Sequence, residues 1–278
     1  MKLFDGKKAA QKILAETKKE IVRSGKKPRL AIILVGEDEA SKLYVKLKKS
    51  AAKKIGIEVE EFDFLAVSPE KEILSKISEL NEDAAVSGII VQLPLPAALD
   101  KNKIIGAIDA KKDVDGFHAE NQKMLKSGKF NFFPVLPLAI LTAIKDALGD
   151  NFEKKKALAL VNSETFGSVL KAVLEKEKIK MEFLVRNACL VSGAEKEMRE
   201  ADILISVCGC PKMIKVDMIK EGAALIDAGI TRYHDGKVAG DVDQESVFSK
   251  ASFLTPMPGG VGPLTVALLL RNVFLASR

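Results

Sequence analysis

Short apolar segments alternate with amphipathic helical segments along almost the whole sequence, and this alternation limits the possible folds more than any other feature. The segment PRLAIILVG (28–36) is continuously apolar and ends in a glycine, as expected for a buried strand, and GIIVQLPLP (88–96) repeats the pattern. Residues 7–23 instead carry apolar side chains at helical spacing. Buried strands that alternate with helices form mostly parallel sheets covered by helices. The sequence therefore predicts an α/β fold.

The alternation is interrupted once and then resumes. After the loop DAKKDVDGFHAEN (109–121), two prolines in FFPVLPLAILTAIKDALG (132–149) precede a new helical segment, and further strands and helices follow as far as ALIDAG (224–229). A chain of 278 residues is long enough for two such units. We therefore expect two doubly wound domains around a cleft. One is formed by residues 1–136 with 256–278, and the second, Rossmann-like and dinucleotide-binding, by residues 137–255.

The composition indicates a folded protein with no strong nucleic-acid signal. Hydrophobic residues make up 47% of the chain and charged residues 29%, so there is enough apolar material for a core. The net charge is +6, but the lysines are scattered among acidic residues and only 5% of residues are aromatic. The first residues lack the apolar region of a signal peptide, and no apolar run is long enough to span a bilayer. We therefore expect a cytoplasmic protein that binds neither nucleic acid nor membrane.

The cysteines do not have the spacing of a metal site. Cys208 and Cys210 form a C-x-C pair, Cys189 stands alone, and no second pair or histidine cluster lies nearby. We therefore expect buried thiols on strands and no bound metal.

Tyr44 and Lys48 stand four residues apart in SKLYVKLKKS (41–50), a segment with helical periodicity. Residues at this spacing project from one face of a helix, so both side chains can reach the same ligand. Burial lowers the pKa of a lysine and allows it to exchange protons near neutral pH. The spacing alone leaves a second interpretation open, because a lysine-rich helix usually faces water.

Other polar or glycine-rich segments lie where open α/β sheets bind ligands, at the carboxyl ends of predicted strands. Gln92 follows a strand in VQLPLP, and Asp115 lies in KDVDGF. Each has an ordinary alternative, a glutamine that satisfies backbone groups and an Asp-x-Asp-Gly turn. The loop PGGVG (258–262) would let a ligand approach backbone N–H groups at the start of the last helix, or it is only a tight connection.

Taken together and in order, these segments are much more specific. The series Tyr44-x-x-x-Lys48, GIIVQLPLP, KDVDGF, ADILISVCGCPKMIKVDMIKEGAALIDAGI, GDVD and TPMPGGVGPLTVALLL resembles the bifunctional methylenetetrahydrofolate dehydrogenase/methenyltetrahydrofolate cyclohydrolase family over nearly the whole chain. Members of that family oxidise 5,10-methylenetetrahydrofolate with a nicotinamide dinucleotide and hydrolyse the methenyl product to 10-formyltetrahydrofolate. The resemblance implies both activities here, with tetrahydrofolate one-carbon derivatives as substrates, NADP or NAD as cofactor, no metal, and a homodimer.

The resemblance also implies roles for individual residues. Lys48 looks like the essential catalytic lysine, Gln92 like its hydrogen-bond partner, Tyr44 like the catalytic aromatic residue that flanks the folate, and Asp115 like the carboxylate that binds the pterin. Substrate-binding roles are further implied for Pro258, Gly259 and Gly260. The implied cofactor-binding residues are Asn162, Ser163, Gly167, Arg186 and Ile230.

The segment VNSETFGSV (161–169) departs from the family pattern Gly-Arg-Ser-x-x-Val-Gly-x-Pro. Ser163 and Gly167 are kept, but Val161 and Asn162 replace the glycine and the arginine. We expect Val161 to bring a branched side chain to the turn that should hold a pyrophosphate, and Asn162 to lack the charge that pairs with the 2′-phosphate of NADP. The sequence therefore predicts weak dinucleotide binding, a reduced preference for NADP, and cyclohydrolase activity that outlasts dehydrogenase activity. Arg186 is a nearby cation that can compensate.

Three alternatives remain at the level of the sequence. The protein could be a cyclohydrolase alone with a degenerate dinucleotide site, or a folate-binding homologue without activity. The joint presence of Lys48, Gln92 and Asp115 argues against the second of these, because binding alone does not require the lysine and its partner. A Tyr-x-x-x-Lys pair also occurs in short-chain dehydrogenases, but those enzymes need a glycine-rich turn before the tyrosine, whereas the first strand here ends in LVGEDEAS.

Overall fold

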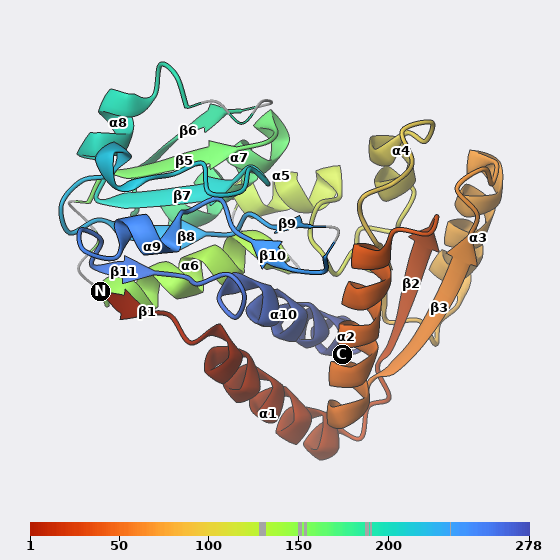
Figure 1. Ribbon diagram of the computed structural model, residues 1–278. Helices are drawn as coiled ribbons and strands as arrows, with labels where there is room; N and C mark the ends of the chain where they lie inside the picture. The colour runs from red at the N-terminus through yellow and green to blue at the C-terminus, as the bar shows by residue number, and fades with distance from the viewer. Residues whose placement is uncertain (128–131, 150–151, 153–154, 187–188, 190, 234) are drawn as a thin grey trace. The chain divides into compact units, whose positions relative to one another are not determined.

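Strands and helices alternate along the chain, as predicted, and they form two units (Figure 1). The computed structural model describes residues 1–127, 132–149, 152, 155–186, 189, 191–233 and 235–278. One unit consists of Met1–Ala9 and Leu136–Thr265, and the other of Ala10–Val135 and Val266–Arg278. Helices α1 and α10 run from one unit into the other.

The unit containing Ala10–Val135 is built on a parallel sheet of three strands in the order β3-β2-β4. Five isoleucines on β2, α3, β4 and α4 are 0% exposed and form the centre of its core, namely Ile33, Ile73, Ile77, Ile89 and Ile104. Because the central strand β2 is covered on both faces, it reads as a continuous apolar run rather than an alternating one. The elements are α1 (Gly6–Ser24), β2 (Arg29–Val35), α2 (Glu39–Ile55), β3 (Glu58–Phe64), α3 (Glu70–Glu82), β4 (Gly88–Val91), α4 (Lys101–Gly106), α5 (Ala119–Ser127) and α10 (Val261–Ala276).

The unit containing Leu136–Thr265 is built on a parallel sheet of six strands in the order β1-β11-β8-β7-β5-β6. Figure 1 shows β5 lying between β6 and β7. The strand order reverses at β5, and open α/β sheets bind their ligands at the carboxyl ends of the strands at such a point. The elements are β1 (Lys2–Leu3), α6 (Val135–Leu148), β5 (Ala157–Val161), α7 (Glu164–Lys176), β6 (Met181–Val185), α8 (Glu195–Glu200), β7 (Ile203–Val207), the short 3-10 helix Val216–Met218, β8 (Ala224–Asp227), β9 (Thr231–Arg232), β10 (Val238–Ala239), α9 (Gln244–Val247) and β11 (Phe253–Leu254).

These two parallel sheets confirm the predicted α/β class. The two units do not coincide with the predicted domains at residues 1–9 and 256–265, which lie with the six-stranded sheet. The reason is that β1 pairs with β11, with Lys2 opposite Phe253. The functional division into a folate domain (1–136 with 256–278) and a dinucleotide domain (137–255) stays a prediction.

The last helix, α10, is apolar on almost all sides and is covered by protein. Leu264, Ala267, Leu270 and Val273 are each 0% exposed. In the described part of the chain, no helix is both long enough and apolar enough to cross a membrane.

The prediction of buried thiols on strands is wrong. Cys189 and Cys210 form a disulfide, and Cys208 has a free thiol. All three cysteines lie in segments that follow β6 or β7, and Cys189 is exposed. No group of three or more His, Cys, Asp or Glu side chains that could hold a metal occurs among the described residues.

Candidate active site

One face of helix α2 carries the predicted catalytic pair. Asp38 caps the helix and accepts a hydrogen bond of 2.7 Å from the backbone N–H of Ser41. Ser41, Tyr44 and Lys48 are three and four residues apart and therefore lie along one side of the helix. Tyr44 and Lys48 are half-buried, whereas Lys46 is exposed. The interpretation of this helix as an entirely solvent-facing lysine cluster therefore does not hold for Lys48.

Lys48 and Gln92 are in direct contact. The Lys48 Nζ donates a hydrogen bond of 2.7 Å to the Gln92 Oε1. The Gln92 Nε2 donates to the backbone oxygen of Leu93 (2.8 Å), which also accepts from the Ser41 Oγ (3.3 Å). The backbone N–H of Gln92 donates to Ile33 O on β2 (2.9 Å). Gln92 is thus fixed at the end of β4 with its amide oxygen directed at the lysine.

Lys48 and Asp115 influence each other's protonation. Burial lowers the pKa of Lys48, and the negative charge of Asp115 partly offsets this effect. Burial raises the pKa of Asp115 to about 6, which Lys48 opposes and Asp113 reinforces. Both groups therefore change protonation state closer to neutral pH than they would in water. An amine in this state can accept and return a proton during a reaction.

The turn that presents Asp115 is organised by Asp113. The buried Asp113 carboxylate accepts hydrogen bonds from the backbone N–H groups of Gly116 (3.2 Å) and His118 (2.7 Å) and from the Asn121 Nδ2 (2.9 Å). The predicted Asp-x-Asp-Gly turn is therefore present, with Asp113 as its carboxylate.

Gly116 is required in that turn for two reasons. Its φ of +81° is unfavourable for other residues, and a Cβ there would lie 2.8 Å from Pro134 Cα. The backbone oxygen of Asp115 accepts from the N–H of Val135 (3.1 Å), so residues 115 and 116 are held against the start of α6.

Asn272 is a supporting residue that the sequence analysis missed. It is only 4% exposed, lies in the apolar helix α10, and its Nδ2 donates to Val114 O (2.9 Å) and Phe133 O (3.1 Å). An asparagine in the segment LLLRNVFL, which is apolar except for Arg271 and Asn272, is the signal that could have identified it, because a buried amide needs hydrogen-bond partners. Ser41 and Asp113 were missed as well, since each only positions a neighbour.

The glycine-rich loop before α10 belongs to the unit with the six-stranded sheet, whereas Tyr44, Lys48, Gln92 and Asp115 belong to the other unit. Pro258 follows a cis peptide bond, and Gly259 has a φ of +103°. A Cβ on Gly6, in α1, would lie 1.7 Å from Gly260 O, so the loop and the start of α1 can approach each other only because residue 6 is a glycine.

The turn from β5 to α7 lies at the point where the strand order reverses. Ser163 caps α7 and its side chain accepts from the backbone N–H of Phe166 (3.3 Å). Asn162 is exposed. Val161 ends β5 and is 0% exposed, so its side chain belongs to the core. The Val161 side chain is therefore packed against protein and not exposed at the turn, and the weak dinucleotide binding expected from Val161 and Asn162 stays a prediction.

Two other residues with a predicted cofactor role have different surroundings. A Cβ on Gly167 would lie 2.4 Å from the Phe183 ring, so this glycine lets α7 pack closely on β6. The third glycine of dinucleotide-binding turns has the same packing role. Ile230 follows β8 and is 39% exposed at the carboxyl edge of the sheet.

Arg186 directly follows β6 at the same edge. Its backbone N–H donates to Val161 O (2.7 Å), and its Nη1 lies 3.4 Å from Val185 O. Its Nε is buried, and no described residue accepts a hydrogen bond from it. In Rossmann-type folds an arginine near the end of the second strand can accommodate the 2′-phosphate of NADP. The Arg186 side chain at this edge therefore fits the 2′-phosphate of NADP.

Comparison with known proteins identifies the family. Residues 4–115 match the family model for the tetrahydrofolate dehydrogenase/cyclohydrolase catalytic domain, and residues 134–278 match the model for the NAD(P)-binding domain of the same family. The chain belongs to the tetrahydrofolate dehydrogenase/cyclohydrolase family. This confirms the predicted family, the two-domain α/β fold, and the enzyme class of folate dehydrogenase and cyclohydrolase, and it excludes a short-chain dehydrogenase.

Individual relatives cover almost the whole chain. The bifunctional protein FolD of Moorella thermoacetica is 41% identical over 285 residues, covering 99% of this chain and 98% of the relative. The crystal structure of the FolD methylenetetrahydrofolate dehydrogenase/cyclohydrolase from Campylobacter jejuni has a TM-score of 0.89 and 35% identity, covering 100% of this chain and 98% of its own. The enzyme from Trypanosoma brucei, solved with NADP and an inhibitor, has a TM-score of 0.91 and 28% identity, and the match covers 99% of this chain and 96% of the Trypanosoma brucei chain.

Proposed function

We propose that this protein oxidises 5,10-methylenetetrahydrofolate with NADP and hydrolyses the resulting methenyl compound to 10-formyltetrahydrofolate. The observation that carries the proposal is the 2.7 Å hydrogen bond between Lys48 Nζ and Gln92 Oε1, with the Asp115 carboxyl acting on the pKa of the same lysine. Such an amine is oriented by one neighbour and has its protonation tuned by another, as a general acid and base requires.

Lys48 has two tasks in the hydrolysis. The methenyl bridge is a cationic amidinium, so attack by water on its carbon releases a proton, which the neutral Lys48 amine accepts. The resulting ammonium then donates this proton to N5 of the folate as the bond from the bridging carbon to N5 breaks. As the C=O of the formyl group forms, the hydroxyl derived from the attacking water loses its proton to solvent. The products are a formyl group on N10, an N–H at N5 and one released proton, and Lys48 returns to its neutral form. Gln92 keeps Nζ in place throughout, because its amide oxygen accepts from both amine and ammonium.

Asp115 and Tyr44 bind the substrate in this proposal. An ionised carboxylate can accept two parallel hydrogen bonds from an aminopyrimidine, which matches the edge of a pterin. The Tyr44 ring, one turn before Lys48 on α2, supplies an apolar surface beside the folate. Pro258, Gly259 and Gly260 are proposed to contact the substrate through their backbone.

The dehydrogenase step asks less of the protein. Bound NADP supplies a hydride acceptor for the methylene carbon, and the chain has to hold the two ligands in position. We assign this holding to Asn162, Ser163, Gly167, Arg186 and Ile230. Arg186 supports NADP over NAD, since its buried Nε has no partner among the described residues and a 2′-phosphate would provide one.

The remaining parts of the proposal concern the whole protein. We place it in the cytoplasm, as expected for folate one-carbon chemistry. We also propose a homodimer, because the edge strand β6 carries the partly exposed apolar residues Phe183, Leu184 and Val185.

A single absorbance experiment tests the two activities separately. Purified protein is given methylenetetrahydrofolate with NADP or with NAD, and formation of the methenyl compound is followed; in a second assay the methenyl compound is supplied directly and its loss is followed. We expect activity in both. A cyclohydrolase alone, the second candidate favoured by Asn162 in place of the family's arginine, would be active only in the second assay. Activity in neither assay would refute the proposal.

A further inference from the structure

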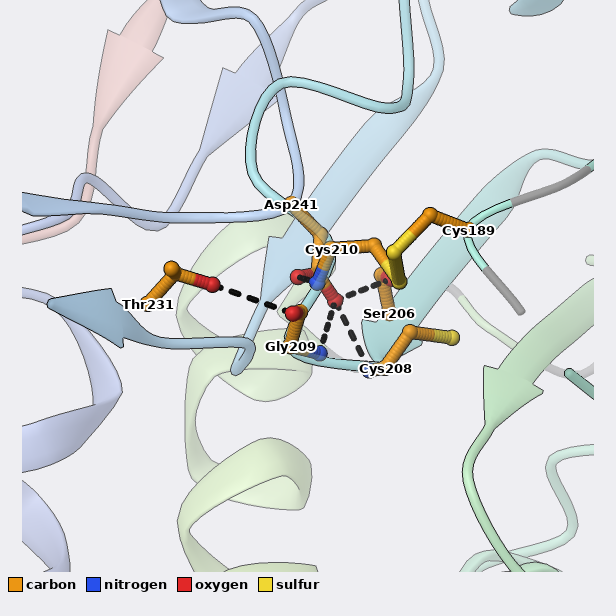
Figure 2. Close-up of a disulfide and its surroundings, with 7 residues drawn as sticks. All are labelled: Cys189, Ser206, Cys208, Gly209, Cys210, Thr231 and Asp241. Atoms are coloured by element: carbon orange, nitrogen blue, oxygen red, sulfur yellow. Dashed lines mark hydrogen bonds between the residues drawn. A yellow bond between two sulfur atoms is a disulfide. The ribbon is translucent and has the colours of Figure 1, made fainter. Parts of the chain in front are cut away.

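A disulfide lies at the edge of the six-stranded sheet where we propose that the dinucleotide binds. Cys189 follows β6 and Cys210 follows β7, and the two are joined with their Cα atoms 5.2 Å apart (Figure 2). Cys189 is exposed and Cys210 is buried, while Cys208 keeps a free thiol. All three cysteines of the chain are therefore gathered at this edge.

The position of the bridge follows from the order of the strands. Neighbouring strands lie about 4.8 Å apart, so β6 and β7, on either side of β5, are separated by about 10 Å. The Cα atoms of Cys189 and Cys210 are much closer than that. Cys189 and Cys210 therefore approach each other beyond the carboxyl end of β5, the strand that lies between β6 and β7. The pyrophosphate of a dinucleotide would occupy this place, at the turn from β5 into α7.

One end of the bridge is firmly held. The buried Asp241 carboxylate accepts hydrogen bonds from the backbone N–H groups of Cys208 (2.8 Å), Gly209 (3.3 Å) and Cys210 (2.6 Å) and from the Ser206 Oγ (2.6 Å). Figure 2 shows these bonds converging on the one carboxylate. The backbone N–H of Asp241 in turn donates to Asp227 Oδ1 (3.0 Å). The segment with Cys210 is thus fixed, and the exposed Cys189 is the end of the bridge that a small oxidant or reductant can reach.

Cys208 is a poor competitor for this bridge. Burial raises the pKa of its thiol, and the Asp241 carboxylate raises it further. Since only the thiolate attacks a disulfide, a raised pKa slows exchange with the neighbouring bridge. The pairing of Cys189 with Cys210 can therefore form and open without Cys208 replacing one of them.

We propose that Cys189 and Cys210 are a redox-active pair that controls the dinucleotide site, with the disulfide form excluding NADP from the carboxyl end of β5 and the dithiol form admitting it. The inference rests on the proposed dehydrogenase function. Lys48, Gln92 and Asp115 all belong to the other unit, so methenyl hydrolysis continues in both forms. Oxidation turns a bifunctional enzyme into a cyclohydrolase.

The oxidant is a low-molecular-weight disulfide. The thiolate of one cysteine attacks it, forms a mixed disulfide and releases one thiol; the second cysteine then attacks the mixed disulfide, forms the Cys189–Cys210 bond and releases the other thiol. The protein loses two electrons and two protons, and the small disulfide is reduced to two thiols. A dithiol reverses both steps. In a reducing cytoplasm the dithiol form is the resting state.

The test compares NADP binding in the two forms of the full-length protein. One sample is treated with oxidised glutathione and the other with dithiothreitol; each is then freed of reagent, its thiols are counted in denaturant, and NADP is titrated into it by calorimetry. We expect one thiol per chain after oxidation and three after reduction. We expect NADP to bind the reduced form and the Kd to be higher by about a hundredfold or more in the oxidised form, because the bridge occupies the place of the pyrophosphate. The rate of methenyl hydrolysis should be equal in both samples.

Two variants assign the effect to the correct pair. Cys189→Ser changes an exposed side chain and should bind NADP equally after either treatment, whereas Cys208→Ser should keep the redox dependence of the parent protein. Three outcomes would overturn the inference while leaving the dehydrogenase proposal intact. The first is equal NADP affinity in the two parent samples, and the second is a glutathione adduct in place of the internal bond. The third is a redox dependence of NADP binding that survives in Cys189→Ser. Binding of NADP in neither form would overturn both.

Discussion

The substitution Lys48→Met tests the core of the proposed chemistry. It removes the Nζ that donates to Gln92 Oε1 over 2.7 Å but keeps a long unbranched side chain, so no large cavity is opened on α2. General acid–base catalysis contributes about 10²- to 10⁴-fold in rate, equal to about 2.7–5.4 kcal/mol of transition-state stabilisation. We expect hydrolysis of the methenyl compound to fall by that factor, with kcat carrying most of the loss.

The effect on stability should be much smaller. Leaving the Gln92 amide oxygen without its donor costs about 1–3 kcal/mol if the oxygen stays dry. The oxygen is half-buried and can bind water, and the variant no longer has to bury an ammonium, so the two contributions oppose each other. The loss of activity should therefore occur in a folded protein.

The assay follows the decay of methenyltetrahydrofolate absorbance above the uncatalysed rate, together with thermal unfolding of the same sample. Lys46→Met is the matched control, because Lys46 is exposed on the same helix and undergoes the same chemical change. If Lys48→Met hydrolyses the substrate as fast as Lys46→Met, Lys48 is an ordinary helix lysine and the mechanism is refuted.

Four further predictions address the remaining residues and the assembly. Asp115→Ala should weaken folate binding far more than NADP binding in calorimetry, since the proposed partner of this carboxylate is the pterin; equal losses would make it a structural residue. The kcat/KM for hydrolysis should fall as the pH falls through about 6, where Asp115 takes up a proton and stops accepting hydrogen bonds, and Asp115→Asn should lack this acidic limb. Arg186→Ala should raise the Kd for NADP by about tenfold without changing the Kd for NAD, and Asn162→Arg should lower the Kd for NADP, because each variant changes a cation available to the 2′-phosphate. Tight and strongly NADP-selective binding that is unchanged in Arg186→Ala would contradict this assignment. Light scattering at micromolar concentration should find a dimer, and a monomer would remove that part of the proposal.

The contact between Lys48 and Gln92 shows what could be predicted from the sequence. The helical spacing places Lys48 on a defined face of α2, and the rule that ligands bind at the carboxyl ends of parallel strands selects Gln92 after β4. The family resemblance then indicated that Gln92 is the hydrogen-bond partner of Lys48. The supporting residues Ser41, Asp113 and Asn272 were not found, since each acts on a backbone group whose position is set only by the folded chain.

The cysteines and Val161 show where sequence reasoning fails. Cys189 and Cys210 are 21 residues apart, and nothing local indicates that these two residues, which follow different strands, are joined. The interpretation of Val161 treated its position in a family motif as a position at the surface of a turn. In the structure β5 continues through residue 161, and all five residues of this strand are buried, so Val161 is part of the core.

The two proposed activities depend on different physical means, and this makes them separable by experiment. Hydrolysis is proposed to depend on two partly buried groups in one unit, where burial shifts the pKa values of Lys48 and Asp115 and the charge of each partly offsets the shift of the other. Dinucleotide binding is proposed to depend on the other unit, through the turn after β5, Arg186 and the Cys189–Cys210 pair. A change at Lys48 should therefore leave NADP binding intact, and oxidation of the cysteines should leave hydrolysis intact. Each activity thus serves as the folding control for a perturbation of the other, because a variant that keeps one of them cannot have lost the second through general unfolding.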